Sequence, residues 1–181
     1  MTQPTLFLAT ALAQVEPPSE RLVNGLTLLV VLVISGVTLA AFITLLAALL
    51  PGPVTRSQTV LLHSPWRAFW LGLVNYLFLG GISLALLSTE IQILVLAGLL
   101  LATFLTVVTG FGLAGLARLT GERLAGLRNT AASPWQALLW GTITVELAAL
   151  LPFLGWFVLT PILLMLSFGA AVLGWRSQKV M

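Results

Sequence analysis

The chain of 181 residues contains no cysteine, no aspartate and only one histidine, His63. The lack of cysteine excludes disulfide bonds, thiolate metal sites and cysteine nucleophiles. A single histidine without aspartate cannot form a zinc site or a serine–histidine–aspartate triad. The sequence also has no HExxH motif and no glycine-rich phosphate-binding loop. We therefore expect a protein without catalytic residues, without a metal and without a bound cofactor.

Charged residues are also scarce. Only 7% of the residues are charged and 59% are hydrophobic, whereas about a quarter are charged in an average soluble domain. The eight lysines and arginines outnumber the five glutamates but are scattered beside apolar runs, which argues against nucleic-acid binding. The composition predicts an all-α integral membrane protein in contact with the lipid bilayer.

Long apolar runs predict a membrane domain at 22–176 with about five transmembrane helices, a first helix followed by two related hairpins. The predicted spans are residues 22–50, 67–88, 91–117, 134–151 and 156–175. The last two divide one apolar stretch, which as a single helix would be roughly 60 Å long, about twice the hydrocarbon thickness. The expected turn lies near Pro152 and Gly155. Alternatively, Thr160 and Pro161 start the last helix after a short irregular piece at 152–159.

The segments between the spans are expected to be short or to lie at the membrane surface. Residues 51–66 predict an interfacial loop that carries Arg56 and His63, after a proline-rich stop at residue 51. Residues 118–133 predict another loop, part of which is an amphipathic surface helix, because leucines recur there at helical spacing. Thr89 and Glu90 predict a tight turn.

The two ends are read as tails. Residues 1–21 resemble either a signal-peptide core followed by a proline-rich linker or an apolar tail at the interface, and both readings stay open. Residues 177–181 are expected to form a cytoplasmic tail.

The basic residues predict the orientation. The five-span arrangement leaves only Arg21 on one side and puts the other basic residues together. These are Arg56, Arg67, Arg118, Arg123, Arg128, Arg176 and Lys179. The positive-inside rule then places the N-terminus outside and the C-terminus in the cytoplasm.

An internal repeat links the two hairpins. The segments SPWRAFWLG at 64–72 and SPWQALLWG at 133–141 agree at five of nine positions. A shorter echo links residues 110–114 with 167–171. This pattern predicts a parallel duplication of a hairpin rather than an inverted one. The alternative is that Ser-Pro-Trp is simply a favourable start for a membrane helix.

Glu146 is the one charged residue between Ser133 and Trp175. It lies about 16 Å along its helix from Trp135, near mid-membrane, where an ionised carboxylate is costly. Asn75 lies at a similar depth and is the expected hydrogen-bond partner. The three readings are a structural pair with Asn75, docking to a basic residue of another subunit, and proton or cation transport.

Two further groups of residues suit membrane helices. Small residues that allow close helix approach are Gly36, Ala40, Gly110, Gly112, Ala114, Gly169, Ala170 and Gly174. Tryptophans expected to anchor helix ends at the headgroups are Trp66, Trp135, Trp156 and Trp175.

Several of these runs together resemble a known group of proteins. The runs are SPWRAFWLG at 64–72, GLARLTGERL at 115–124, LPFLGW at 151–156 and FGAA at 168–171. They resemble the multi-span membrane region of uncharacterised bacterial proteins associated with bactofilin-type polymer-forming domains. The resemblance implies a bacterial membrane scaffold and brings no catalytic residues. This chain departs from that pattern, since we expect no room in it for the β-helical polymerising domain.

The sequence thus predicts a non-catalytic accessory subunit or scaffold of a bacterial membrane protein complex, in the cytoplasmic membrane or an internal membrane derived from it. Its partners would be lipid and other membrane subunits. The alternative is a small carrier or channel that moves protons or a small solute past Glu146. A third reading, a subunit that holds a pigment or quinone without histidine, is indicated by no motif.

Overall fold

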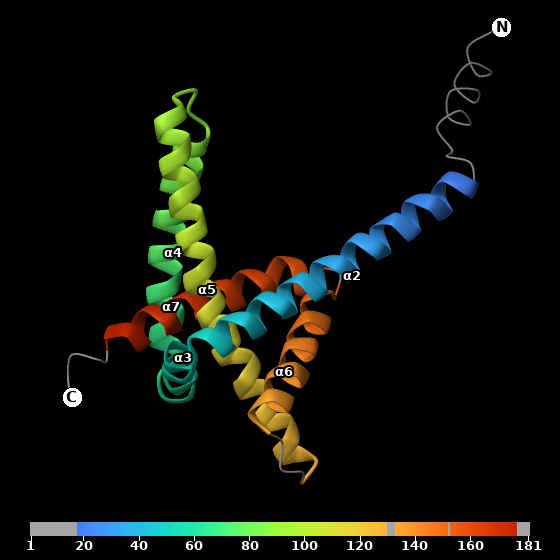
Figure 1. Ribbon diagram of the computed structural model, residues 1–181, viewed down its shortest axis with the longest axis vertical. Coiled ribbons are helices and arrows are strands. Elements are labelled where there is room, and N and C mark those ends of the chain that lie inside the picture. Colours follow the sequence, from blue (N-terminus) through green and yellow to red (C-terminus); the bar gives the residue numbers. More distant parts are fainter. Residues whose placement is uncertain (1–17, 130–132, 152, 177–181) are drawn as a thin grey trace, which may run out of the picture. The chain divides into compact units, whose positions relative to one another are not determined.

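The computed structural model describes residues 18–129, 133–151 and 153–176, and within them the side chains from residue 22 onward. Every element in this part of the chain is a helix, which confirms the all-α prediction (Figure 1). The helices are α2 (Pro18–Leu49), α3 (Pro51–His63), α4 (Pro65–Leu87), α5 (Gln92–Leu127), α6 (Pro134–Ala149), the short π-helix η1 (Leu154–Leu159) and α7 (Thr160–Arg176). The signal-like segment, the side chain of Arg21, Lys179 and the C-terminal tail lie outside the described residues.

The chain divides into two compact units, residues 1–38 and 39–181. The described part of the first unit is the beginning of α2, whose apolar side chains are exposed from Leu22 onward. The second unit contains the end of α2 and all the other helices. Its core includes Val108, Phe111, Leu138 and Phe168.

Four helical segments are long and apolar enough to cross a bilayer, which supports a helical membrane protein. They are Leu22–Leu49, Pro65–Leu87, Gln92–Leu127 and Leu154–Arg176. The number differs from the five predicted spans because α6 has only 16 residues, about 24 Å of helix. Pro152 shortens α6, since a proline disfavours helical geometry in the residue before it.

Two segments predicted as loops, the second of them with a surface helix in part of it, contain more helix than expected. The first long helix ends at Leu49, just before the prolines, as predicted, but residues 51–63 form α3 instead of a loop. Pro51 and Pro53 lie in the first turn of α3, where backbone N–H groups have no intrahelical acceptor, so their missing N–H groups cost no hydrogen bond. The predicted break after residue 117 is also wrong, because α5 continues to Leu127 over a segment that contains no proline.

Within the second unit, α4 and α5 form an antiparallel hairpin through the turn at Ser88–Ile91 (Figure 1), as predicted for Thr89 and Glu90. Helix α6 packs along the C-terminal half of α5, and α7 runs across α4 and α5. The predicted second hairpin is therefore not a packed pair, because α6 and α7 each pack on other helices rather than on each other. Helix α3 packs against α5 and α7. Chain connectivity and these contacts bring the starts of α4 and α6 and the ends of α5 and α7 towards the same end of the unit, which we call the basic end.

The two Ser-Pro-Trp segments begin helices at equivalent positions but are capped differently. The hydroxyl of Ser133 accepts a hydrogen bond from the backbone N–H of Gln136, and the Gln136 side chain accepts one from the Ser133 N–H. This is a complete capping box. Ser64 makes no side-chain cap, and its N–H donates to the carbonyl of Val60 in α3. Arg67 occupies the position of Gln136 and has no acceptor for such a box.

Candidate functional site

The closest contact between α4 and α7 is built on two glycines. A Cβ atom on Gly72 would overlap the carbonyl group of Met165, and one on Gly169 would overlap the carbonyl group of Ala68. Each glycine therefore lies directly against the backbone of the other helix. Without a side chain at these positions, the two helix backbones can come close enough for extensive van der Waals contact.

Helices α5 and α6 meet in the same way. A Cβ atom on Gly141 would overlap the carbonyl group of Ala117, and one on Gly121 would overlap that of Ala137. Ala137 and Gly141 correspond to Ala68 and Gly72 in the repeat. The repeated sequence thus makes the same glycine-dependent crossing twice, with a different partner helix each time.

The shorter echo is not reflected in the packing. In the two helix crossings, Gly121 takes the place of Gly169. The short sequence repeat instead aligns Gly169 with Gly112. Gly112 lies instead against the backbone of Ser167, in the contact between α5 and α7. Ser167 is fully buried, and its hydroxyl has no hydrogen-bond partner among the described residues.

Four more of the predicted packing residues also lie inside the chain's own contacts. Gly110 faces Phe42 and Leu46 at the end of α2, and Gly174 faces Arg56 of α3. Ala114 and Ala170 are fully buried. These residues are therefore not free to bind another subunit. Gly36 and Ala40 lie in α2, one in each of the two units.

Two adjacent glycines of α4 behave differently. A Cβ atom on Gly80 or Gly81 would meet nothing within 4 Å. The residues around them on the same helix face, including Leu77 and Leu84, are exposed. The prediction overlooked this pair, although the signal was present as a Gly-Gly dipeptide in the middle of a predicted span.

A polar network joins α3 to α5 at the basic end. The Nε2 atom of Gln58, which is buried, donates to Oε2 of Glu122 at 2.6 Å. Arg118 donates through Nε to Oε1 of the same carboxylate at 3.1 Å. The sequence placed Glu122 in a loop, and the missed signal was Gln58, a polar residue on the inner face of α3.

The expected pair of Glu146 and Asn75 is not formed. Asn75 donates through Nδ2 to the carbonyl of Leu71 on its own helix. The Oε1 atom of Glu146 is buried and has no partner among the described residues. The pairing fails because α4 packs on α7 whereas α6 packs on α5, so equal depth does not bring the two side chains together.

Irregular backbone follows α6. Phe153 has a φ of 62°, which is uncommon for a residue with a side chain, and the π-helix η1 starts at the next residue. Gly155 lies against the carbonyl groups of Ala148 and Ala149. Strained residues and π-helical turns are frequent at functional sites. The α-helix begins at Thr160, as in the alternative, but the six residues before it are π-helical rather than irregular. Together they form the apolar segment Leu154–Arg176, which contains the predicted span 156–175.

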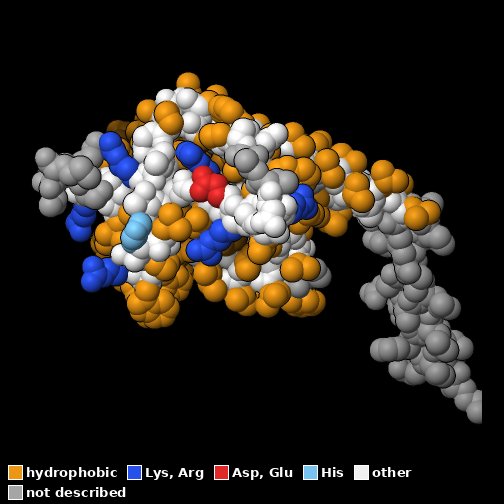
Figure 2. All heavy atoms as spheres, turned by 90° about the horizontal axis from the view of Figure 1, so that it is seen from below, with side chains coloured by type: hydrophobic (Ala, Val, Ile, Leu, Met, Phe, Trp, Pro, Cys, Tyr) orange, Lys and Arg blue, Asp and Glu red, His pale blue; other side chains and the backbone are white. Residues whose placement is uncertain are grey.

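The predicted anchor tryptophans and the described basic side chains lie at the surface of the protein. All four predicted anchors, Trp66, Trp135, Trp156 and Trp175, are exposed. Figure 2 shows several arginine side chains on the face seen there, some of them beside an acidic side chain, with hydrophobic side chains around them. The described arginines fall on α3, at the start of α4, along the end of α5 and just after it, and at the last residue of α7.

No metal site is found in the described residues, since no three potential ligands come together there. The ring of His63 is exposed, with Nδ1 2.9 Å from the carbonyl oxygen of Thr59. Comparisons with protein-family models, with curated proteins and with solved structures find no match to this chain. The resemblance to membrane regions associated with bactofilin-type domains therefore stays a prediction.

Proposed function

We propose that this protein is a non-catalytic accessory subunit or scaffold of a bacterial membrane protein complex. The four long apolar segments and the many exposed leucine, valine and phenylalanine side chains support a location in the bilayer. In this proposal the membrane is the bacterial cytoplasmic membrane or an internal membrane derived from it.

The pair of open glycines, Gly80 and Gly81, carries the proposal. Gly72, Gly121 and Gly141, which lie within helices of the same unit, fit directly against another helix. Gly80 and Gly81 leave the same kind of close-approach surface empty on the exposed side of α4. A helix of another membrane subunit would fill it by the packing that this chain already uses internally.

The proposed orientation puts the basic end in the cytoplasm and the N-terminus outside. It is supported by the arginines at the start of α4 and at the ends of α5 and α7. Helix α6 starts at the basic end and α7 ends there. In this proposal the C-terminus is therefore cytoplasmic whether α6 and α7 cross the whole bilayer or only part of it.

The experiment compares what copurifies with the full chain from its native membrane in mild detergent. Gly81→Leu should fold normally, because a Cβ atom at this position meets nothing within 4 Å and the surrounding helix face is exposed, but it should lose a stoichiometric partner identified by mass spectrometry. Leu100→Phe is the matched control, since Leu100 is exposed on α5 near the level of Gly81. Ser83 of α4 donates a hydrogen bond of 3.0 Å to the carbonyl of Gly98 of α5. Because the two helices are antiparallel, Gly81 and Leu100, each two residues away from this contact, lie at about the same height. A partner retained equally by all three proteins would overturn the proposal.

A second candidate function is a small carrier for protons, and the unpartnered Oε1 of Glu146 favours it. This carboxyl group lies seven residues before the strained Phe153, and carboxyl groups inside membrane helices mark proton pathways in other proteins. Flux measured in proteoliposomes tests this function. Proton flux that is abolished by Glu146→Gln would support the carrier, and no flux above that of empty liposomes would contradict it.

A further inference from the structure

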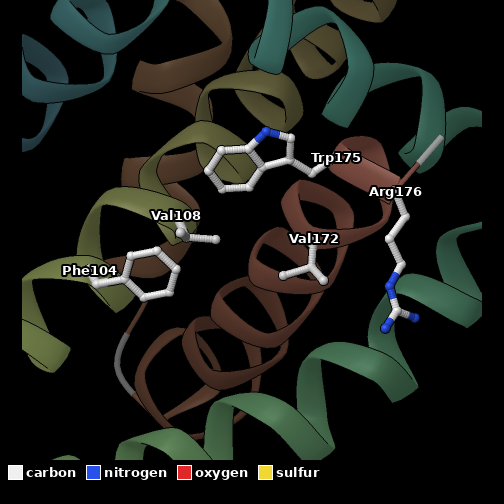
Figure 3. Close-up of a pocket in the computed structure, with 5 residues that line it drawn as sticks. All are labelled: Phe104, Val108, Val172, Trp175 and Arg176. Atoms are coloured by element: carbon white, nitrogen blue, oxygen red, sulfur yellow. The ribbon is translucent and has the colours of Figure 1, made fainter. Parts of the chain in front are cut away.

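An open groove of about 570 Å³ lies between α5 and α7, within the roughly 300–1,000 Å³ typical of small-ligand sites. Phe104 and Val108 line it from α5, and Val172, Trp175 and Arg176 line it from α7 (Figure 3). The four apolar side chains face a common space. The Arg176 side chain extends away from the Trp175 ring.

The groove has an apolar interior and a cation at its edge. Arg176 is exposed and makes no hydrogen bond or ion pair with any residue in the described part of the chain. Its long side chain can cover apolar surface with its methylene groups while the guanidinium reaches the headgroup region. Trp175 beside it suits the same depth, because indole rings prefer the membrane–water interface.

The direction of the groove follows from the helices. Helix α5 runs towards the basic end, so Phe104 lies one turn deeper in the apolar part of the molecule than Val108. Before Phe104, α5 exposes Leu96, Leu99 and Leu100, which leave that end of the groove open to lipid. The groove therefore connects a cation at the basic end with an apolar surface at membrane depth.

This combination defines the chemistry of the ligand. A free phosphate ion would use the guanidinium but not the apolar groove, and an apolar helix of another protein would gain nothing from the cation. A molecule with an anionic headgroup and a hydrocarbon chain uses both. We propose that the groove binds an anionic phospholipid, with an acyl chain against Phe104, Val108 and Val172 and the headgroup phosphate at Arg176. The proposal requires the membrane location but not a partner subunit.

Quenching of Trp175 by brominated lipid tests the site directly. The full chain is reconstituted in phosphatidylcholine vesicles in which the same minor fraction of lipid is brominated phosphatidylglycerol or brominated phosphatidylcholine. The difference between the wild type and Trp175→Phe isolates this tryptophan from the other five. We expect roughly fivefold stronger apparent binding of the phosphatidylglycerol, the effect of one basic residue near a headgroup.

Substitutions distinguish specific lipid binding in the groove from nonspecific attraction of anionic lipid to the basic end. Arg176→Gln should remove the preference for phosphatidylglycerol, and Arg176→Lys should keep most of it. Arg123→Gln is the matched control, since it removes the same charge from α5 about 22 Å beyond Val108, and it should keep the preference. Equal quenching by both lipids, a preference that survives Arg176→Gln, or an equal loss in Arg123→Gln would each overturn the proposal.

Discussion

Gly72 on α4 and Gly141 on α6 lie 69 residues apart and hold the same place in two separate helix crossings. Each fits against a carbonyl group of its partner helix, that of Met165 for Gly72 and that of Ala117 for Gly141. The internal repeat thus encodes a contact and not only a favourable start for a membrane helix. This relationship leads to the first prediction.

Adding one methyl group at either crossing should destabilise the protein. Gly72→Ala and Gly141→Ala force the helices apart, and overpacking of this kind typically costs about 1–3 kcal/mol. Unfolding by denaturing detergent, followed by circular dichroism, measures the change. Gly80→Ala is the control and should leave stability unchanged or slightly higher, since its Cβ meets nothing within 4 Å. Equal effects at positions 72 and 80 would contradict the assigned crossings.

The two Ser-Pro-Trp segments should respond differently to loss of the serine hydroxyl. Ser133→Ala breaks a complete capping box and should cost about 1 kcal/mol. Ser64→Ala removes a hydroxyl that makes no cap and should change stability little. The same unfolding assay compares the two variants directly. A larger loss for Ser64→Ala than for Ser133→Ala would show that the caps are assigned wrongly.

The network at the basic end predicts an unequal cost for its two hydrogen bonds. Glu122→Ala leaves the buried amide of Gln58 without its acceptor, which should cost about 1–3 kcal/mol. Arg118→Ala removes only a partly exposed ion pair and should cost less than about 1 kcal/mol. A double-mutant cycle between Gln58 and Glu122 measures their coupling, and a coupling near zero would remove the proposed link between α3 and α5.

Glu146 should contribute nothing to stability through hydrogen bonding. Because its Oε1 is buried without a partner in the described chain, replacement by an apolar side chain removes an unfavourable burial. Glu146→Leu should therefore be at least as stable as the wild type when purified alone. A clear loss of stability in that variant, compared with Glu146→Gln, would show that the carboxyl group has a structural partner.

Depth in the membrane could be predicted from the sequence, but the neighbours of each residue could not. Apolar runs located α2, α4, α5 and α7 because hydrocarbon requires apolar side chains whatever the helix packs against. Asn75 and Glu146 were placed at similar depths by counting residues. Which helix faces which depends on small residues such as Gly72 and Gly121, whose partners lie far away in the sequence.

The ends of helices were predicted less well than the ends of apolar runs. Arg118 and Glu122 mark where the sequence becomes polar, and the span was ended just before them. Backbone hydrogen bonding needs no apolar surroundings, so α5 continues through both residues. Pro51 likewise predicts the end of a helix, but proline equally suits the first turn of the next helix.

Cross-linking at Gly81 in native membranes tests the central claim most directly, namely that another membrane subunit covers the open glycines of α4. The chain contains no cysteine, so Gly81→Cys introduces a single thiol, and Leu100→Cys provides an equally exposed thiol on α5. The account predicts one discrete cross-linked product, of reproducible mass, from Gly81→Cys and none from Leu100→Cys. No product from either position, or the same products from both, would contradict it.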